Sequence, residues 1–267
     1  MDFIVIPFVF LFGLAVGSFL NVCIYRMPID KSVVNPPSAC PQCGTPIKWY
    51  DNIPVLSYIL LRGRCRSCKA GISVRYLIVE LATALLFVLF YTAGVSRGGI
   101  PLAALYLALT GALIVCTGID FEHYIIPDAI TLPGTAIAVA ACAIFPGMIG
   151  AQTHWGGALL SVAGAAAGSG ILFAVAKTAE FILKKEAMGM GDVKLLAMIG
   201  ACIGWKLTLM TIFFSSMIGS SVGIALMLTG RAKMQSAIPF GPYISAGALL
   251  SVLIGDPLIR WYFSLMF

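Results

Sequence analysis

The chain has 267 residues, of which 60% are hydrophobic and only 10% are charged, with a net charge of +6. Soluble domains carry about 25% charged residues, so this composition, with a mean hydropathy of +0.99, excludes an ordinary soluble protein. The hydrophobic residues form runs of about twenty without the alternating polarity of a barrel, and we expect an all-α polytopic membrane protein. The basic residues lie in loops beside these runs, so the positive charge does not indicate nucleic-acid binding.

The hydrophobic segments predict about eight transmembrane helices. The first has no basic region before it and is long enough to span, so we expect it to be retained and not cleaved as a signal peptide. The sixth would give only about 18 Å of helix against a hydrocarbon core of about 30 Å. It either starts within the bilayer or forms a broken helix with the seventh, the break lying at Gly204. The expected segments are 3–25, 76–95, 101–119, 129–150, 156–183, 193–204, 207–229 and 239–264.

The positions of Lys and Arg predict that the chain starts outside. Eight crossings then place most of the 17 basic residues in inner loops and leave Arg97, Lys206 and Arg260 outside, as the positive-inside rule requires. Seven crossings, with the sixth and seventh segments fused, would move Arg231 and Lys233 outside and fit less well. The inner set is Arg26, Lys31, Lys48, Arg62, Arg64, Arg66, Lys69, Arg75, Lys177, Lys184, Lys185, Lys194, Arg231 and Lys233.

A hydrophilic stretch over 26–75 interrupts the membrane pattern, and we interpret it as a small cytoplasmic domain. It contains two CxxC pairs with zinc-ribbon spacing, Cys40 with Cys43 and Cys65 with Cys68. Four thiolates close a tetrahedral structural zinc site, which would stabilise a domain whose core is small. Unrelated free thiols are the alternative. The other four cysteines stand alone in hydrophobic segments and are interpreted as packing residues: Cys23, Cys116, Cys142 and Cys202.

Two aspartates lie at the ends of hydrophobic segments, where a carboxylate is costly and usually functional. Asp120 ends the third segment, and Asp192 follows Gly189-Met190-Gly191 at the start of the sixth. Two carboxylates held close share a proton, so one can activate water while the other polarises a scissile carbonyl. We therefore predict a proteolytic pair, with Gly189 and Gly191 admitting a substrate strand. A flexible loop ending in an N-cap Asp192 is the alternative.

The other acidic residues have simpler interpretations. We expect Asp128 to cap the helix that follows Pro127, and Glu122 and His123 to lie in an interfacial loop. Glu80 is early in the second segment and needs a partner, which is either Arg75 or a basic residue of the insertion, or else a bound cation such as an amino terminus or a sulfonium. The rest are expected to be solvated, ion-paired or in turns: Asp2, Asp30, Asp51, Glu180, Glu186 and Asp256.

Further motifs follow one another along almost the whole chain. They are Gly17-Ser18-Phe19-Leu20-Asn21-Val22-Cys23-Ile24-Tyr25-Arg26, Trp49-Tyr50-Asp51-Asn52-Ile53-Pro54, Leu61-Arg62-Gly63-Arg64-Cys65, Ile72-Ser73-Val74-Arg75-Tyr76, Ile119-Asp120, Pro127-Asp128, Gly189-Met190-Gly191-Asp192-Val193-Lys194 and Pro239-Phe240-Gly241-Pro242-Tyr243. With the double CxxC, this order resembles the type IV prepilin peptidases, a family of GxGD-type intramembrane aspartyl proteases. Presenilin-like GxGD proteases lack the zinc ribbon, and the chain has no PAL motif near its C-terminus.

The resemblance implies a bifunctional enzyme of the bacterial inner membrane. It would remove the short basic leader of prepilins and pseudopilins, the subunits of type IV pili and type II secretion, at the cytoplasmic face. It would then methylate the new N-terminal residue with S-adenosylmethionine. By motif position, Asp120 and Asp192 are the catalytic residues. Gly189, Gly191, Lys194 and Asp128 would support the loop and the substrate.

The expected cofactors are a structural zinc ion at the four cysteines and S-adenosylmethionine. The chain has no GxGxxG turn, so a Rossmann-type donor site is not expected, and our candidates for donor binding are Asn21 and Glu80. The expected domains are the first helix at 1–25, the zinc-binding insertion at 26–75 and a transmembrane catalytic helical domain at 76–267. The sequence does not predict an oligomeric state.

The competing hypothesis is a membrane transporter or assembly scaffold that uses the two aspartates for ion coupling. Transporters place such charges near the bilayer midplane and often contain repeats. Here both aspartates are expected near one face, and no internal repeat is visible. Proteolysis therefore remains the favoured interpretation.

Overall fold

The computed structural model describes residues 2–184, 188–230 and 238–266, and all regular elements in these ranges are helical. Five helices are long and apolar enough to cross a membrane, and a shorter apolar helix lies at Asp128–Ile144. The predicted all-helical membrane fold is therefore confirmed. The predictions for Lys185, Glu186, Arg231 and Lys233 fall outside the described residues.

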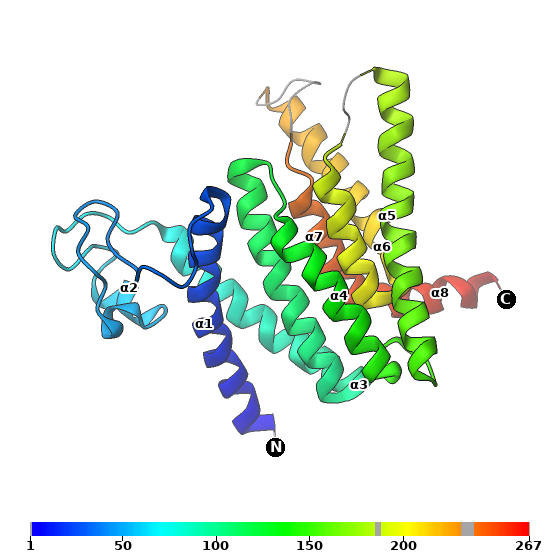
Figure 1. Cartoon of the computed structure of the whole chain (residues 1–267), viewed down its shortest axis with the longest axis horizontal. Helices are drawn as coiled ribbons and strands as arrows, with labels where there is room; N and C mark the ends of the chain where they lie inside the picture. The colour runs from blue at the N-terminus through cyan, green and yellow to red at the C-terminus, as the bar shows by residue number, and fades with distance from the viewer. Residues whose placement is uncertain (1, 185–187, 231–237, 267) are drawn as a thin grey trace.

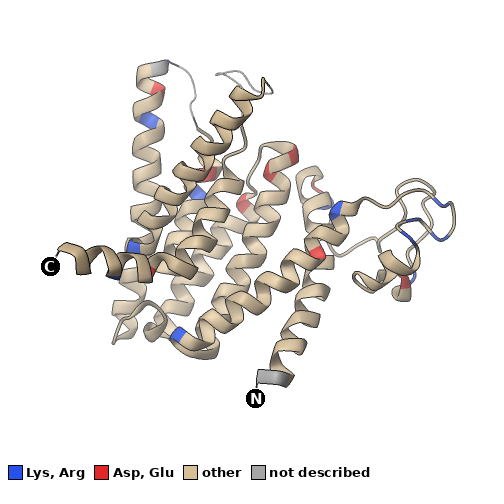
Figure 2. Cartoon of the chain, turned by 180° about the vertical axis from the view of Figure 1, so that it is seen from behind, with Lys and Arg blue, Asp and Glu red and all other residues tan. Residues whose placement is uncertain are grey.

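The helices form one bundle with a small insertion at its side (Figure 1). Charged residues are sparse along the bundle, and most of them lie near helix ends or on the insertion (Figure 2). The elements are α1 (Asp2–Arg26), η1 (Met27–Ile29), η2 (Trp49–Asn52), α2 (Leu56–Leu60), α3 (Val74–His123), α4 (Asp128–Ile144), η3 (Pro146–Ile149), α5 (His154–Leu183), α6 (Met190–Leu228), α7 (Gly241–Leu250), the π turn η4 (Ser251–Gly255) and α8 (Asp256–Met266).

α3 is a helical hairpin that contains the predicted segments 76–95 and 101–119. Gly99 has a φ of 75°, a conformation that glycine adopts readily and that interrupts the helix. The rings of Phe90 and Tyr106 lie 6.4 Å apart. Their sixteen-residue separation would span about 24 Å in a straight helix. The chain therefore turns back at Gly99, and Figure 1 shows the two arms of α3.

α6 is broken in the same way at Gly204, whose φ is 76°. Leu196 and Thr208, on opposite sides of the break, both lie within 3.0 Å of the position that a Cβ on Gly168 would occupy. In a straight helix these two residues would be about 18 Å apart. The sixth and seventh segments are thus two arms that reverse at Gly204, the residue at which the sequence predicts a break.

The last predicted segment, 239–264, is divided in the structure. α7 leads through the π turn η4 into α8, which leaves the bundle at a steep angle (Figure 1). Arg97, next to the α3 turn, donates hydrogen bonds to the carbonyl oxygens of Val252 and Leu253 in η4. Because a π turn disrupts the regular hydrogen-bond ladder of a helix, carbonyl groups in η4 can accept hydrogen bonds from Arg97.

The main core joins the second arm of α3, α4, the first arm of α6 and α7. Its fully buried side chains include Leu113, Leu195, Ile199 and Ile244. A second cluster packs α1 on α3 through Ile24, Val115 and Ile119. The four single cysteines are buried, as predicted. Both clusters adjoin the end of α3, so the packing fixes the helix ends that carry the two aspartates.

Candidate functional site

Asp120 lies in the last turn of α3 and is 5% exposed. Its Oδ2 accepts a hydrogen bond of 2.9 Å from the backbone N–H of Gly241, the first residue of α7. The first N–H groups of a helix have no partner within the helix and carry partial positive charge, so they suit a carboxylate. A Cβ on Gly241 would lie 2.8 Å from that Oδ2. Only glycine allows this approach without displacement.

Asp192 lies in the first turn of α6 and is 9% exposed. The N-cap of α6 is Gly189, and the N–H of Asp192 donates to its carbonyl at 3.2 Å. The alternative in which Asp192 is the N-cap is therefore wrong, because the helix begins earlier than the hydrophobic pattern suggests. Gly191 packs closely on the loop after α3, since a Cβ there would lie 3.0 Å from the Cβ of Ile126.

The structure brings the two aspartates into one site. Ile126 lies against Gly191 and also close to Gly241, so the start of α6 and the start of α7 meet at the same loop. Gly241 binds Asp120 and Gly191 precedes Asp192, so the contact of both glycines with Ile126 brings the two carboxylates to the same place. Among the described residues, neither carboxylate has a cationic partner. Two buried carboxylates without a counter-ion can share a proton and perform acid–base chemistry.

Asp128 and Lys194 form an ion pair beside this site, with Nζ 2.7 and 2.8 Å from the two carboxylate oxygens. Asp128 is the first residue of α4, and the N-cap position is occupied by Pro127. The capping prediction is therefore wrong, because the carboxylate turns to Lys194 on α6. Lys194 follows Asp192 by two residues, so the pair joins the start of α4 to the first turns of α6.

Glu122 and His123 belong to the last turn of α3 and not to a loop. Glu122 forms an ion pair with Arg75 at the start of α3. Arg75 is thus not the partner of Glu80, and the predicted salt bridge of Glu80 is wrong. The carboxylate of Glu80 instead accepts the N–H of Val55 at 2.8 Å and is also hydrogen-bonded to Ser18.

Asn21 and Glu80 both stabilise the contact of α1, α3 and the insertion. Asn21 is 4% exposed, and its Nδ2 donates to the carbonyl of Tyr76 at 3.1 Å. A cavity of about 370 Å³ lies between α1 and the insertion. Neither residue lines it. The polar and apolar wall includes Ser18, Phe19, Arg26, Asn52 and Pro54.

The four cysteines of the insertion form one cluster, and their Sγ atoms lie within 4.8 Å of one another. The Sγ atoms of Cys40 and Cys68 are 3.8 Å apart. Tetrahedral zinc with Zn–S bonds of about 2.3 Å requires sulfur atoms about 3.8 Å apart, so the cluster fits zinc. A hydrogen bond to Thr45 lowers the pKa of the Cys43 thiol to about 6, which favours the thiolate that binds metal.

Each CxxC pair sits in the same type of turn. In the first turn, the N–H of Cys40 donates to the carbonyl of Thr45, and the carbonyl of Cys40 accepts from the N–H of Gly44. In the second turn, the N–H of Cys65 donates to the carbonyl of Ala70, and the carbonyl of Cys65 accepts from the N–H of Lys69. An ion pair of Arg66 with Asp51, at 2.6 Å, joins the second turn to η2. This hydrogen bond holds the pKa of the Asp51 carboxyl below its usual range.

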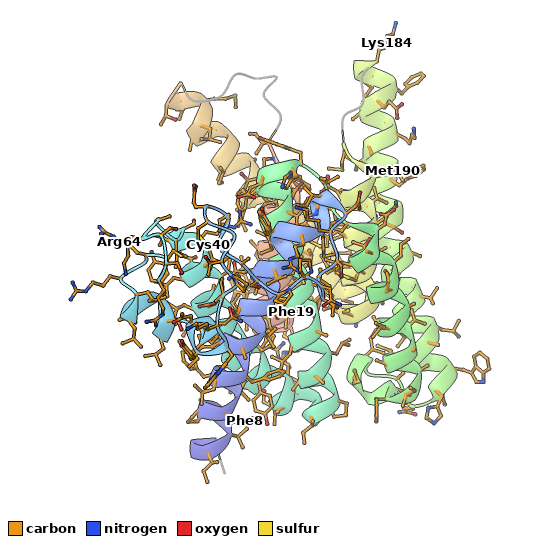
Figure 3. The ribbon with its side chains drawn as sticks, turned by 60° about the vertical axis from the view of Figure 1, so that its left-hand side comes forward. Phe8, Phe19, Cys40, Arg64, Lys184 and Met190 are labelled. Carbon is orange, nitrogen blue, oxygen red and sulfur yellow. The ribbon has the colours of Figure 1, made fainter. Side chains whose placement is uncertain are left out.

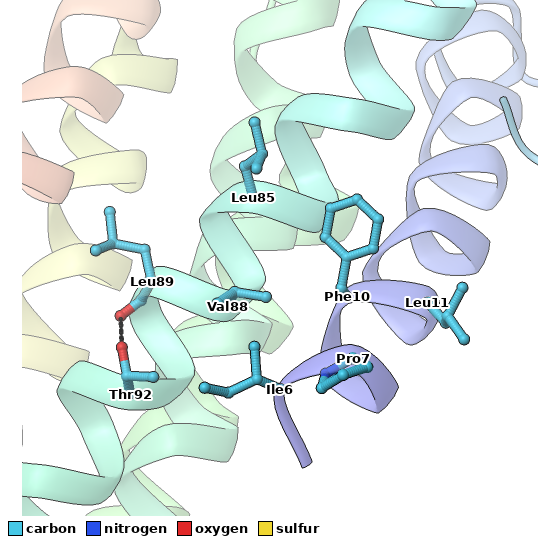
Figure 4. A pocket seen from close by; sticks show the side chains of 8 residues that line it. All are labelled: Ile6, Pro7, Phe10, Leu11, Leu85, Val88, Leu89 and Thr92. Carbon is cyan, nitrogen blue, oxygen red and sulfur yellow. Dashed lines mark hydrogen bonds between the residues drawn. The ribbon is translucent and has the colours of Figure 1, made fainter. Parts of the chain in front are cut away.

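A larger cavity, of about 550 Å³, lies between α1 and the first arm of α3 (Figure 4). Ile6, Pro7, Phe10, Leu85 and Val88 line it together with three further residues. None of the eight side chains is charged. The cavity therefore offers shape and apolar contact but no acid–base chemistry.

Three contacts of the site were not predicted. The N–H of Gly241 donates to Asp120, and the N–H of Val55 donates to Glu80. Ile126 packs against both Gly191 of α6 and Gly241 of α7. Gly241 followed by Pro242 does signal a helix start, because proline is favoured in the first turn. No sequence signal marks Val55, whose φ of 60° is exceptional for a β-branched residue.

The chain matches two protein families in succession. Residues 11–93 match the Bacterial Peptidase A24 N-terminal domain, and residues 107–224 match the Type IV leader peptidase family. Curated relatives named prepilin leader peptidase/N-methyltransferase include those of Aeromonas hydrophila, 38% identical over 95% of this chain and 92% of the relative, and Pseudomonas aeruginosa, 36% identical over 94% and 91%. That of Myxococcus xanthus is 42% identical over 84% of this chain and 64% of the relative. No solved structure matches. The chain belongs to the type IV leader peptidase family.

Proposed function

We propose that this protein cleaves the leader peptide of prepilins and pseudopilins and methylates the new N-terminal residue. The observation that carries the peptidase function is the convergence of Asp120 and Asp192 at buried helix ends, without a counter-ion among the described residues. The names of the relatives supply the substrate class and the methyl transfer. Carboxylates at helix ends give no support to ion coupling at midspan.

In the proposed peptidase reaction, one aspartate is ionised and takes a proton from water. The water oxygen attacks the scissile carbonyl, and the other, protonated aspartate donates a hydrogen bond to the carbonyl oxygen. The proton then passes to the departing amine. The Gly241 N–H orients Asp120, and Gly189 leaves room for an extended peptide, whereas Gly191 supports the site by letting α6 pack closely on Ile126. Asp128 and Lys194 support the loop beside it.

The chain is proposed to cross the inner membrane eight times, with the aspartates at the cytoplasmic face. The reversals at Gly99 and Gly204 support two crossings each for α3 and α6. The proposed domains are the first helix at 1–25, the insertion at 26–75 and the catalytic helices at 76–267. Basic residues of the insertion support its cytoplasmic position by the positive-inside rule.

A structural zinc ion is proposed at Cys40, Cys43, Cys65 and Cys68. Four thiolates leave no open coordination position, so the ion would hold the two turns together and take no part in proteolysis. S-adenosylmethionine is proposed to bind at the cavity between α1 and the insertion. Arg26 can bind its carboxylate, and Asn21 and Glu80 would hold the cavity wall in place.

The test uses the purified full chain and a synthetic prepilin, with and without S-adenosylmethionine, analysed by mass spectrometry of the new N-terminus. We expect cleavage in both samples and a mass increase of one methyl group only with the donor. Absence of cleavage by zinc-loaded protein would contradict the peptidase function. Cleavage without methylation would contradict only the methyltransferase half.

A further inference from the structure

The insertion lies alongside the membrane helices and not beyond their ends. Ala15 and Ser18 of α1 share a cavity wall with Asn52 and Pro54 of the insertion. Ser18 precedes the end of α1 at Arg26 by eight residues, which is about 12 Å along the helix. This part of the insertion therefore reaches into the depth that the adjoining membrane leaflet occupies, since half of a hydrocarbon core is about 15 Å.

α2 starts at this depth. Val55, directly before α2, donates its N–H to Glu80 at 2.8 Å. Glu80 is six residues into α3, about 9 Å from its start. Arg75 and Glu122 form an ion pair at that end of α3 and mark the polar boundary. The hydrogen bond between Val55 and Glu80 thus holds the start of α2 on the membrane side of the ion pair between Arg75 and Glu122.

α2 presents an apolar face to its surroundings. Leu56, Ile59 and Leu60 are 49%, 62% and 71% exposed. The opposite face is polar and bound within the insertion, since Ser57 donates to the carbonyl of Tyr50 and Tyr58 donates to a backbone carbonyl. Figure 1 shows α2 at the edge of the insertion farthest from the C-terminal end of α1. Contact with acyl chains would remove this face from water.

Exposed basic residues flank α2 in the sequence. Asp51 is the acidic residue nearest to α2 in the chain, and it is already paired with Arg66. Arg64 extends away from the bundle (Figure 3). Amphipathic helices with flanking cations bind anionic lipids in this way, and an exposed Trp49 nearby is typical of an interface. The exposed cations of this part of the chain are Lys48, Arg62, Arg64, Arg66 and Lys69.

We propose that α2 is an interfacial helix that inserts Leu56, Ile59 and Leu60 among the acyl chains of the adjoining leaflet. The flanking Lys and Arg side chains bind anionic headgroups. The partner of this surface is the lipid bilayer, not the peptide substrate and not a second copy of the chain. The inference is independent of the proposed proteolysis, because it rests on the depth and exposure of α2.

The test places a single tryptophan on α2. In the full zinc-loaded chain, Trp49, Trp155, Trp205 and Trp261 become Phe, and either Leu60→Trp or the matched control Gln42→Trp is added. Gln42 is exposed in the first cysteine turn. Each protein is reconstituted, one chain per nanodisc, in phosphatidylglycerol and phosphatidylcholine whose acyl chains are brominated or not.

We expect brominated chains to remove about half of the Leu60→Trp emission and much less of the Gln42→Trp emission. Equal quenching of the two probes, or none of Leu60→Trp, would overturn the proposal. A signal that appears only with two chains per disc would assign the surface to a second copy, and protection by added prepilin would assign it to substrate. Both outcomes would also overturn it. Omitting phosphatidylglycerol should reduce the quenching, and zinc content reports whether each variant is folded.

Discussion

The aspartate site and the cysteine cluster are assembled in opposite ways. The aspartate site joins residues that lie up to 121 positions apart, and its geometry depends on the packing of three helix ends in an apolar core. The cysteine cluster uses two short turns within 29 positions and has few buried apolar side chains around it. The geometry of the first site therefore depends on the fold, whereas the second would be held together by the zinc ion proposed at its thiolates.

The largest effect is expected from the aspartates. Asp120→Asn or Asp192→Asn should reduce cleavage about 10³-fold or more, because each removes a group that must transfer or donate a proton. The measurement is the initial rate of prepilin cleavage. Asp256→Asn, at the start of α8, is the matched control and should leave the rate unchanged. A normal rate for either site variant would show that the pair is not catalytic.

A smaller but still large effect is expected from Gly241→Ala. The added Cβ would lie 2.8 Å from Asp120 Oδ2, so the carboxylate or the start of α7 must shift. We expect cleavage to fall about 10²-fold, since misplacement of a catalytic group by about 1 Å has effects of this size. Gly147→Ala is the control, because a Cβ there meets no atom within 4 Å. Zinc content should be the same in both variants.

Substitutions in the cysteine cluster should change metal binding and the stability of the insertion. Replacing Cys40 and Cys43 by Ser should lower bound zinc from about one ion per chain to near zero, measured by elemental analysis. The metal-free insertion should be cut rapidly by an added protease, because its own core is small. Cys142→Ser, in the buried core, should retain zinc. A zinc-free wild-type protein, purified without chelator, would contradict the assignment.

The smallest effect is expected from the ion pair of Asp128 and Lys194. Both side chains are partly exposed, so the pair should contribute less than about 1 kcal/mol. Asp128→Asn, Lys194→Met and the double variant form a cycle in which the interaction energy is read from the cleavage rates. We expect changes of only a few-fold. A loss comparable to that of Asp192→Asn would mean that Lys194 acts directly on the substrate.

The contrast between a site of distant residues and a cluster of local turns also explains which features the sequence could predict. The double CxxC and the Gly189–Asp192 motif are local, and the structure brings the residues of each together. The contact of Asp120 with Gly241 depends on how α7 packs, which no nearby pattern specifies. The cost of a buried carboxylate predicts a cationic partner for Glu80, but its hydrogen-bond partners are a backbone N–H and a hydroxyl, which carry no net charge. Broken helices were expected only at Gly204, since glycines are common in membrane helices and most do not interrupt them.

The ion pair of Arg75 and Glu122 joins the two ends of the α3 hairpin, because Arg75 lies in its first turn and Glu122 in its last. One end is continuous with the insertion, and the other carries Asp120. An exposed pair of this kind contributes about 0.5–1 kcal/mol, so thermal motion would open it roughly a sixth to a third of the time. The ion pair thus links the insertion that carries the four cysteines to the helix end that carries Asp120. High salt, which screens the pair, should loosen their coupling without unfolding either.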